Sequence, residues 1–381
     1  MGDRLRVMTI FGTRPEAVKM APVVQRLRES EDFEPIVAVT AQHREMLDQV
    51  TRLFGITPDY DLDIMQVEQS LADITTRAMR GLYAVVGEAA PSFVLVQGDA
   101  HTTFIGALAA FYHRVPIGHV EAGLRTADKY QPFPEEMNRR MTSVLADLHF
   151  AATPGSRANL LREGVDPATI LVTGNTVIDA LFAVKDRTDI PPVAGLPPLD
   201  GRRLVLVTTH RRENWGDPMR EIYLALLELL ERFPDIEIVF SVHPNPVVRR
   251  VVDDVLRGHP RAHLLEPPEY GPWIHLERRA ALIMTDSGGI QEEATALGIP
   301  TLVLRRVTER PEGIAAGFLT LVGTDRERIV REAARRLDNP SASRSAGARN
   351  PYGDGRAAER IVQALRYYFR RVPTPPEEFA E

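Results

Sequence analysis

The sequence contains no cysteine. Without thiols the chain cannot form disulfides, thiolate zinc sites or a cysteine nucleophile, and two-cysteine racemase chemistry is excluded for the same reason. Its longest apolar runs are far too short to span a bilayer, and no signal-peptide-like apolar stretch follows the N-terminus. We therefore predict a cytoplasmic protein that does not contact membranes.

Several classes of ligand and cofactor also lack support. The formal net charge is −6, which gives no electrostatic reason to expect nucleic-acid binding. No Gly-x-Gly-x-x-Gly follows the first predicted strand and no Walker A loop is present, so neither dinucleotide binding nor P-loop ATPase chemistry is predicted. His119 and Glu121 could suggest a pair of metal ligands, but no further ligands follow at a suitable spacing. We therefore predict neither a cofactor nor a metal.

The remaining composition is that of an ordinary globular protein. Hydrophobic residues make up 44% and charged residues 26% of the 381 residues, a length typical of two or three domains. Short apolar runs alternate with helical patterns in both halves of the chain, which predicts an α/β fold with parallel, doubly wound sheets. The predicted strands include Leu5–Phe11, Ile36–Thr40, Phe93–Gln97, Ile117–Val120, Leu204–Thr209, Ile236–Phe240, Ala281–Met284 and Thr301–Leu304.

A change of composition marks the boundary between two similar halves. Proline and glycine gather between Ile190 and Gly201, which is typical of an interdomain linker. An amphipathic helix follows the second half, and the chain then becomes proline-rich and acidic, which favours disorder. The predicted divisions are an N-terminal domain over 1–185, a linker over 186–200, a C-terminal domain over 201–355, a helix over 356–371 that packs back on the N-terminal domain, and a disordered tail over 372–381.

The most informative stretch is a strand, a glycine turn and a helix at residues 281–298. This arrangement directs backbone N–H groups and the positive end of a helix dipole toward an anion. The hydroxyl of Ser287 adds a donor, and the glycines at 288 and 289 allow a phosphate to approach the backbone closely. Glu293, one helical turn further, could accept hydrogen bonds from a ribose diol. A plain strand-to-helix turn would look similar, so this stretch alone leaves both interpretations open.

Other polar residues follow the predicted strands, where open parallel sheets bind their ligands. Each has a simpler interpretation: Asp99 could cap the helix that follows it, His119 could be a packed histidine, and Glu135 with Arg139 could be an i,i+4 ion pair. His210 precedes two arginines, which favours anion binding. The residues at strand ends are Arg14, Lys19, Asp99 and Glu121 in the first half, and His210, Arg211, Arg212, His243, Ser287, Arg305, Arg306 and Arg310 in the second.

Seven ordered motifs, spread from about Leu5 to about Leu365, resemble the non-hydrolysing UDP-N-acetylglucosamine 2-epimerase family. The resemblance implies two Rossmann-like domains facing across a cleft in a glycosyltransferase-B-type fold, a homodimer, and a role in cell-surface polysaccharide biosynthesis. The motifs are Gly12-Thr13-Arg14-Pro15-Glu16-Ala17, His119-Val120-Glu121-Ala122-Gly123-Leu124-Arg125, Pro134-Glu135-Glu136, Thr209-His210-Arg211-Arg212-Glu213-Asn214, His243-Pro244-Asn245-Pro246, Asp286-Ser287-Gly288-Gly289-Ile290-Gln291-Glu292-Glu293 and Thr308-Glu309-Arg310-Pro311-Glu312.

The same resemblance implies a role for particular residues. Phosphate and ribose of the UDP-sugar substrate would be held by Ser287, Gly288, Gly289 and Glu293, and the diphosphate would be faced by Arg14, His210 and Arg310. The catalytic set would be Asp99, Glu121 and Glu135, supported by Lys19, Arg139 and His210. One departure is visible: Ala100-His101 follows Asp99 where the family commonly has two threonines, which puts the hydrogen bonds beside that carboxylate in doubt.

The implied reaction explains why such residues are needed. The hydrogen on carbon 2 of an N-acetylhexosamine is not acidic, so the anomeric carbon–oxygen bond has to break first. Departing UDP then needs cations and N–H groups, and the proton transfers need a group on each face of the sugar. Three carboxylates meet this demand, and the sequence does not assign the one that removes the proton. A hydrolysing 2-epimerase, an epimerase of a modified sugar and a non-catalytic nucleotide-sugar sensor remain as alternatives.

A second nucleotide-sugar site activates some members of this family. Gln42, Arg211 and His243 are candidates for such a site in this chain. Glu68, however, stands where an activated member has arginine, and an acid there would repel a diphosphate. We therefore expect weak or absent activation by the substrate.

Overall fold

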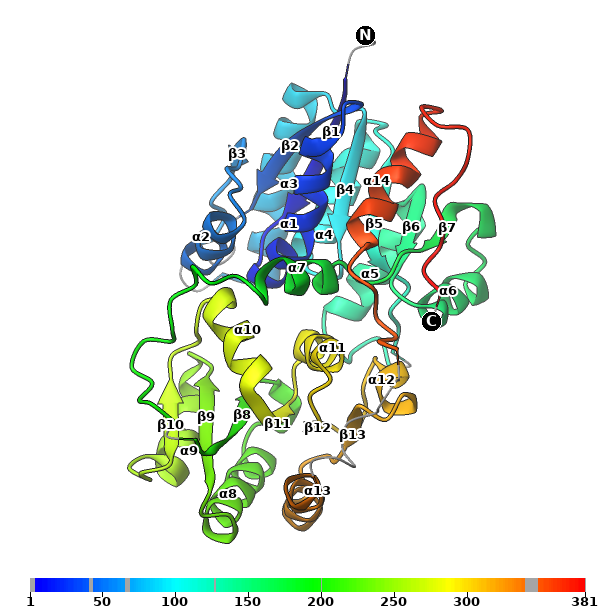
Figure 1. The fold of residues 1–381 in the computed structure, drawn as a ribbon. Coiled ribbons are helices and arrows are strands. Elements are labelled where there is room, and N and C mark those ends of the chain that lie inside the picture. Colours follow the sequence, from blue (N-terminus) through cyan, green and yellow to red (C-terminus); the bar gives the residue numbers. More distant parts are fainter. Residues whose placement is uncertain are drawn as a thin grey trace. The chain divides into compact units, whose positions relative to one another are not determined.

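The computed structural model describes residues 4–40, 44–65, 69–126, 128–199, 201–339 and 349–380. The chain forms two compact units (Figure 1). Unit 1 comprises Met1–Phe182 together with Tyr352–Glu381, and unit 2 comprises Ala183–Pro351. Over the described residues, no helix combines the length and the apolar character needed to cross a membrane.

Unit 1 contains a seven-stranded parallel sheet with the order β3-β2-β1-β4-β5-β6-β7. The chain moves outward from β1 to β3 and then returns to continue from β4 on the other side of β1, so the switch point lies between β1 and β4. The strands are β1 (Leu5–Phe11), β2 (Phe33–Val39), β3 (Tyr60–Asp61), β4 (Phe93–Gln97), β5 (Ile117–Ala122), β6 (Leu148–Ala151) and β7 (Ile170–Val172). The helices are α1 (Arg14–Glu29), α2 (Arg44–Leu53), α3 (Leu71–Ala89), α4 (His101–Tyr112), α5 (Glu135–Leu145), α6 (Pro154–Arg162), α7 (Thr176–Val184), α14 (Ala357–Tyr368) and the 3₁₀ helix η1 (Pro167–Thr169).

Unit 2 repeats this order in a six-stranded parallel sheet, β10-β9-β8-β11-β12-β13, with its switch point between β8 and β11. The predicted α/β class with two Rossmann-like sheets is therefore confirmed. The strands are β8 (Arg203–Thr209), β9 (Ile236–Val242), β10 (Ala262–Leu265), β11 (Ala280–Thr285), β12 (Thr301–Val303) and β13 (Leu319–Leu321). The helices are α8 (Asp217–Arg232), α9 (Pro246–Leu256), α10 (Tyr270–Arg279), α11 (Gly288–Leu297), α12 (Pro311–Ala315), α13 (Arg326–Asp338) and the 3₁₀ helix η2 (Arg212–Asn214).

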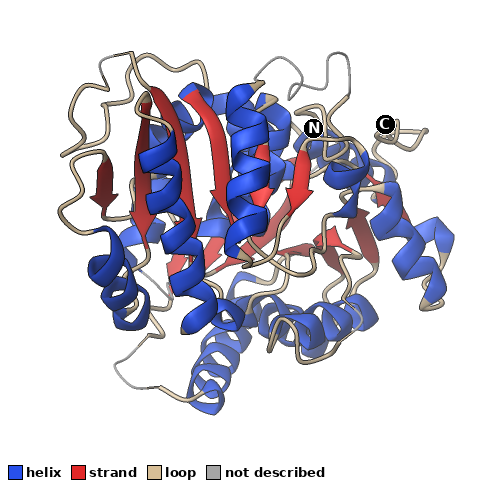
Figure 2. Ribbon diagram, turned by 90° about the horizontal axis from the view of Figure 1, so that it is seen from below, coloured by secondary structure: helices blue, strands red, loops and turns tan. Residues whose placement is uncertain are grey.

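The apolar strand sequences reflect burial on both faces of each sheet. Every residue of β4, Phe93–Gln97, is buried. Helices lie against the strands on either side (Figure 2), so a strand with alternating polar residues would place some of them in the core. Polar residues are therefore displaced to the strand ends, which is where the candidate site is found.

The chain returns from unit 2 to finish unit 1 with α14. Arg366 of this helix donates to Asp32 over 2.7 Å. The rings of Tyr368 and Phe93 meet edge to face at a centroid distance of 5.4 Å. This helix therefore belongs to the packing of unit 1 although it is the last in the chain.

The sequence predicts disorder over 372–381, whereas Glu378 and Phe379 of this tail contact unit 1 in the structure. The backbone N–H of Phe379 donates to the carbonyl of Val172 over 2.8 Å, and its ring is buried. Glu378 forms an ion pair with Arg157 at 2.8 Å. The tail thus covers part of the edge strand β7, and these contacts outweigh its proline-rich, acidic composition.

We expect Asp179→Ala to destabilise unit 1 by about 1–2 kcal/mol, the usual value of a lost helix cap. Asp179 lies on α7, and its carboxylate accepts from the backbone N–H groups of Ala357 at 3.2 Å and Ala358 at 2.8 Å, in the first turn of α14. Urea denaturation of Asp179→Ala and Asp179→Asn would measure this, because asparagine keeps an acceptor oxygen. Equal midpoints for the alanine variant and the unaltered protein would contradict the capping role.

Candidate active site

In unit 1, Glu121 and Lys19 form a buried ion pair at the carboxyl end of β5. The Lys19 ammonium on α1 donates to both carboxylate oxygens, at 2.6 and 2.8 Å. The two residues lie 102 positions apart in the sequence. They meet because β1, which leads into α1, and β5 both flank β4 in register.

Two amides also contact the Glu121 carboxylate. Gln97, the last residue of β4, donates to Oε2, and Asn175 donates to Oε1 at 2.9 Å. A cation and two amide donors are the partners that stabilise an ionised carboxylate. Gln97 and Asn175 were missed by the sequence analysis, since lone amides carry no pattern that would single them out.

The backbone at Glu121 is strained. Its φ is +63°, a left-handed conformation that costs about 1–3 kcal/mol for a residue other than glycine. The register between β5 and β6 shifts between Val120 and Ala122, so Glu121 occupies an irregularity of the kind that redirects a side chain. Such strain is typical of positions whose side chain has to point in a particular direction.

Asp99 lies two residues beyond β4 and pairs with Arg139 of α5. The Asn138 side chain donates to the Asp99 carbonyl at 3.0 Å, so α5 holds this loop through two neighbouring residues. The alternative interpretation, in which Asp99 caps α4, is wrong, because Ala100 occupies the N-cap position of that helix. Glu135 is the first residue of α5, the helix that carries Arg139.

Glu136 is a buried carboxylate that the sequence analysis did not select. It lies 3.2 Å from Arg139 and 2.8 Å from Arg140, and it accepts from the backbone N–H of Thr126 at 3.1 Å. Arg139 is therefore held between the carboxylates of Asp99 and Glu136. The signal that could have identified Glu136 is its i,i+3 and i,i+4 spacing to two arginines.

His119 is a packed histidine, as its simpler interpretation proposed. It is fully buried, and its Nε2 hydrogen bonds to the carbonyl of Gly98 at 2.7 Å. Burial lowers its pKa to about 3, so the ring is neutral and Nε2 carries the hydrogen. The bond fixes Gly98, which has a φ of +72° and precedes Asp99.

The turn before Arg14, the first residue of α1, is fixed by Glu16. The Glu16 carboxylate accepts from the backbone N–H of Gly12 at 3.1 Å and of Thr13 at 2.8 Å, in a capping box. Burial raises its pKa to about 7, although these hydrogen bonds act in the opposite direction. A Cβ on Gly12 would lie 2.0 Å from the hydroxyl oxygen of Thr40, so only glycine fits this turn without a shift of its neighbours.

The residues around the Asp99 loop also have partners. The imidazole of His101 lies 2.5 Å from the hydroxyl of Thr75, and Thr103 donates to the Gln97 carbonyl at 2.6 Å. The loop that differs from the family pattern is therefore tied to both α3 and β4.

In unit 2 the organising group is Asp286, which directly follows β11 and is fully buried. It accepts from the backbone N–H groups of His210 at 3.0 Å and Arg211 at 3.0 Å, and from the Asn214 amide at 3.1 Å. Burial alone would raise its pKa, but His210 and the N–H donors hold the pKa of Asp286 below its usual value. Asp286 therefore connects the Ser-Gly-Gly turn to the loop after β8.

His210 is oriented by that carboxylate. Its Nδ1 lies 3.1 Å from Asp286 Oδ1, which assigns the Nδ1 hydrogen to this contact and leaves Nε2 directed away from it. The ring stacks on His243, with centroids 5.8 Å apart. Arg211 and His243, two of the candidates for a second site, are thus close to His210, while Gln42 and Glu68 lie outside the described residues.

A network of arginines and glutamates supports the glycine turn. Arg310 pairs with Glu292 and Glu309, both at 2.8 Å, and Arg305 pairs with Glu309 at 2.8 Å. A Cβ on Gly288 would lie 2.6 Å from Arg310 Nη1, so glycine here permits contact with the guanidinium. Arg310 and Gly288 were predicted from the sequence, but Glu292 and Glu309 were not identified as their supports.

The turn itself begins α11. Ser287 occupies the N-cap position, and its backbone N–H donates to the Thr285 hydroxyl at 3.0 Å. At Gly289 no described atom lies within 4 Å of where a Cβ would stand. Glu293 is a buried residue of the same helix. The structure thus brings Ser287, Gly288 and Arg310 together in unit 2, and Lys19 with Glu121 and Asp99 with Arg139 in unit 1.

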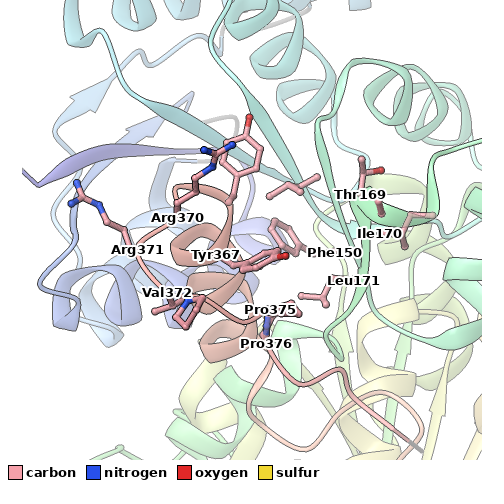
Figure 3. A pocket seen from close by; sticks show the side chains of 15 residues that line it. Phe150, Thr169, Ile170, Leu171, Tyr367, Arg370, Arg371, Val372, Pro375 and Pro376 are labelled. Atoms are coloured by element: carbon pink, nitrogen blue, oxygen red, sulfur yellow. The ribbon is translucent and has the colours of Figure 1, made fainter.

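A pocket of about 700 Å³ lies in unit 1 between β7, the end of α14 and the tail (Figure 3), and its lining includes Phe150, Tyr367 and Pro375 but none of the predicted site residues. Within the described ranges, no group of three or more histidine, aspartate or glutamate side chains is arranged to hold a metal ion.

Comparison with known proteins gives a consistent result. The family model for UDP-N-acetylglucosamine 2-epimerase matches residues 25–366. The UDP-N-acetylglucosamine 2-epimerase of Escherichia coli K12 is 51% identical over 372 residues, covering 95% of this chain and 98% of that protein. S. aureus MnaA, solved as a co-structure with UDP, has a TM-score of 0.93 at 46% identity, with 99% of this chain and 100% of that chain covered. UDP-GlcNAc 2-epimerase from Neisseria meningitidis, solved bound to UDP-GlcNAc, has a TM-score of 0.89 at 45% identity, with 95% and 100% covered.

Proposed function

Because the chain belongs to the UDP-N-acetylglucosamine 2-epimerase family, we propose that it interconverts UDP-N-acetylglucosamine and UDP-N-acetylmannosamine without hydrolysing them. The observation that carries this proposal is Glu121 at the end of β5, whose backbone is strained and whose buried carboxylate is held by Lys19. A protein that only bound a nucleotide sugar would have no use for such a group. As the family resemblance implies, we also propose that the protein works as a homodimer.

The reaction begins with loss of UDP. The bond between the anomeric carbon and the diphosphate oxygen breaks, its electron pair leaves with UDP, and the positive charge that develops on the sugar acidifies the hydrogen on carbon 2. Removal of that proton gives 2-acetamidoglucal. Re-addition of UDP, with a proton delivered to the opposite face of carbon 2, gives the epimer.

The residues of unit 2 bind UDP in this proposal. The N–H groups at the start of α11, with Ser287 and the guanidinium of Arg310, hold the diphosphate, and Glu293 accepts from the ribose. His210 adds a donor to the departing oxygens, and the family resemblance assigns the same role to Arg14, which belongs to unit 1. Support comes from the S. aureus relative, which was solved with UDP.

The residues of unit 1 move the proton. Asp99, Glu121 and Glu135 are the acid/base candidates, and such groups typically contribute about 100- to 10,000-fold in rate. Lys19 and Arg139 hold two of these carboxylates in place and can stabilise their charged forms.

The proposed function predicts uptake of solvent deuterium. Incubation with UDP-N-acetylglucosamine in heavy water should give UDP-N-acetylmannosamine, with deuterium at carbon 2 of both epimers, because the proton exchanges with solvent while the glucal is bound. Proton NMR would follow both signals in one experiment.

Other outcomes of this experiment would identify other functions. Free N-acetylmannosamine with UDP would indicate a hydrolysing enzyme, and no turnover would indicate a sensor or a modified sugar as substrate. An epimer formed with its original hydrogen would contradict the elimination mechanism.

A further inference from the structure

Glu277 is a fully buried acid that the reaction described above does not use. It lies in α10 of unit 2, and its Oε1 accepts a hydrogen bond from the indole Nε1 of Trp273 at 2.7 Å. Its other oxygen, Oε2, is also buried and has no hydrogen-bond partner in the part of the chain that the structure describes. An ionised carboxylate with an unpaired oxygen is costly to bury, so this side chain calls for an explanation.

The charged residue that acts on Glu277 is Glu293, the residue proposed to hold the ribose, which lies in α11, a helix that packs against α10. Burial, and then the charge of Glu293, raise the pKa of Glu277 well above its usual range. Glu293 is itself only 5% exposed. When two buried carboxyl groups interact in this way, they cannot both be ionised easily, and one keeps a proton.

The other charged groups around α10 do not change this picture. Of the elements that pack against it, β11 contains no ionisable side chain, and the arginine of β8, Arg203, pairs with Asp235. In α11 the neighbouring acid, Glu292, pairs with Arg310. The remaining ionisable residues of α10 itself are the buried Tyr270, the half-buried His275 and the exposed Arg278 and Arg279, and none of them acts on Glu277 as Glu293 does.

We infer that Glu277 is a positioning residue for the nucleotide site: it stays protonated beside Glu293, so that Glu293 remains the ionised acceptor, and its Oε1 accepts from Trp273 one turn earlier in the same helix. This inference rests on the proposed function, because Glu293 is assigned to the ribose there. An ionised carboxylate accepts from both hydroxyls of a ribose diol, whereas a protonated one would offer one acceptor fewer. A second anion beside Glu293 would also repel it from that position.

The protonation of Glu277 is tested by Glu277→Gln, whose amide is neutral at every pH and keeps an oxygen for Trp273. The folded protein holds the Glu277 proton above the pH at which the unfolded chain releases it. As the pH rises above about 4.5, the unaltered protein should therefore lose stability relative to the glutamine variant. The melting temperature of Glu277→Gln, relative to that of the unaltered protein, should consequently rise as the pH rises. A difference that does not change with pH would overturn the inference.

The positioning role is tested by UDP binding in Glu277→Leu, which loses both the proton and the bond to Trp273. Calorimetry at pH 7 should show UDP bound at least about fivefold more weakly by the leucine variant, and within about twofold of the unaltered protein by Glu277→Gln. Turnover at saturating substrate should change less than KM. In a Trp215→Phe background, which leaves Trp273 as the single tryptophan, emission should shift in the leucine variant and not in the glutamine variant.

The outcomes separate this inference from the proposed function. If the leucine variant melts at a lower temperature but binds UDP as the unaltered protein does, Glu277 is merely structural and the inference is wrong. If the unaltered protein itself does not bind UDP, the proposed function fails, and the inference fails with it.

Discussion

Replacement of Glu121 by glutamine is expected to lower the epimerisation rate about 100- to 10,000-fold, the range typical of a lost proton-transfer group. UDP affinity should stay within a few-fold, because the residues proposed to bind UDP belong mainly to unit 2. The amide keeps the shape of the carboxylate but cannot take a proton, and it leaves Lys19 without its 2.6 Å ion pair. Rates would be measured by NMR and UDP binding by calorimetry.

Glu237→Gln provides the matched control for this variant. Glu237 is 8% exposed and Glu121 is 7% exposed, and each pairs with a cationic side chain, in the case of Glu237 that of Arg202 at 2.6 Å. Glu237 lies near the amino end of β9, away from the strand ends where the site residues gather. Its replacement should leave the rate within about twofold. If Glu121→Gln abolished UDP binding together with activity, Glu121 would be a structural residue.

Asp286→Asn is expected to weaken UDP binding by more than about tenfold and to destabilise the protein by about 2–4 kcal/mol. The carboxylate accepts from two backbone N–H groups and one amide and also meets Nδ1 of His210. Asparagine would turn an N–H₂ toward these donors and leave at least one of them unsatisfied, at about 1–3 kcal/mol each. Without the charge, His210 would also lose the contact that orients it.

An exposed ion pair serves as the control for Asp286. Asp235 pairs with Arg203 at 2.6 Å, but its side chain is 58% exposed. Asp235→Asn should therefore cost less than about 1 kcal/mol and should not affect UDP binding. Thermal melts and calorimetry on both variants would make the comparison. An Asp286→Asn protein that melted and bound UDP normally would refute the organising role.

The fold could be predicted from the sequence where an element is determined by its own residues. A strand that is buried on both faces has to be apolar along its whole length, so β4 and β8 could be read directly as Phe93–Gln97 and Leu204–Thr209. The ends of strands were predicted less accurately. β2 begins at Phe33, three residues before the predicted start at Ile36. The strand includes Pro35, which lies opposite Val7 of β1. Such register depends on a distant partner.

The candidate active site could be predicted from the sequence only in part. Ionisable residues at strand ends could be selected by their position, but the Lys19–Glu121 pair could not be predicted, because it joins residues 102 positions apart through the register of three strands. Gln97 and Asn175 have no distinctive pattern. Glu277 lies in Trp273-Ile274-His275-Leu276-Glu277-Arg278-Arg279, which resembles a solvated, charged helix end. Its burial follows from its position on the same buried side of α10 as Trp273, one turn away.

Unit 1 is discontinuous, and this has a consequence for synthesis. Ribosomes deliver its seven strands early, but α14 and the tail follow only after all of unit 2 has been made. Until then the surface around Phe93 lacks its covering ring from Tyr368, and β7 keeps an open edge at Val172. Unit 2 can close first, as a continuous segment, while unit 1 is the part of the nascent chain that depends on chaperones or on rapid completion. A stop codon after residue 351 would therefore damage the unit that is translated first.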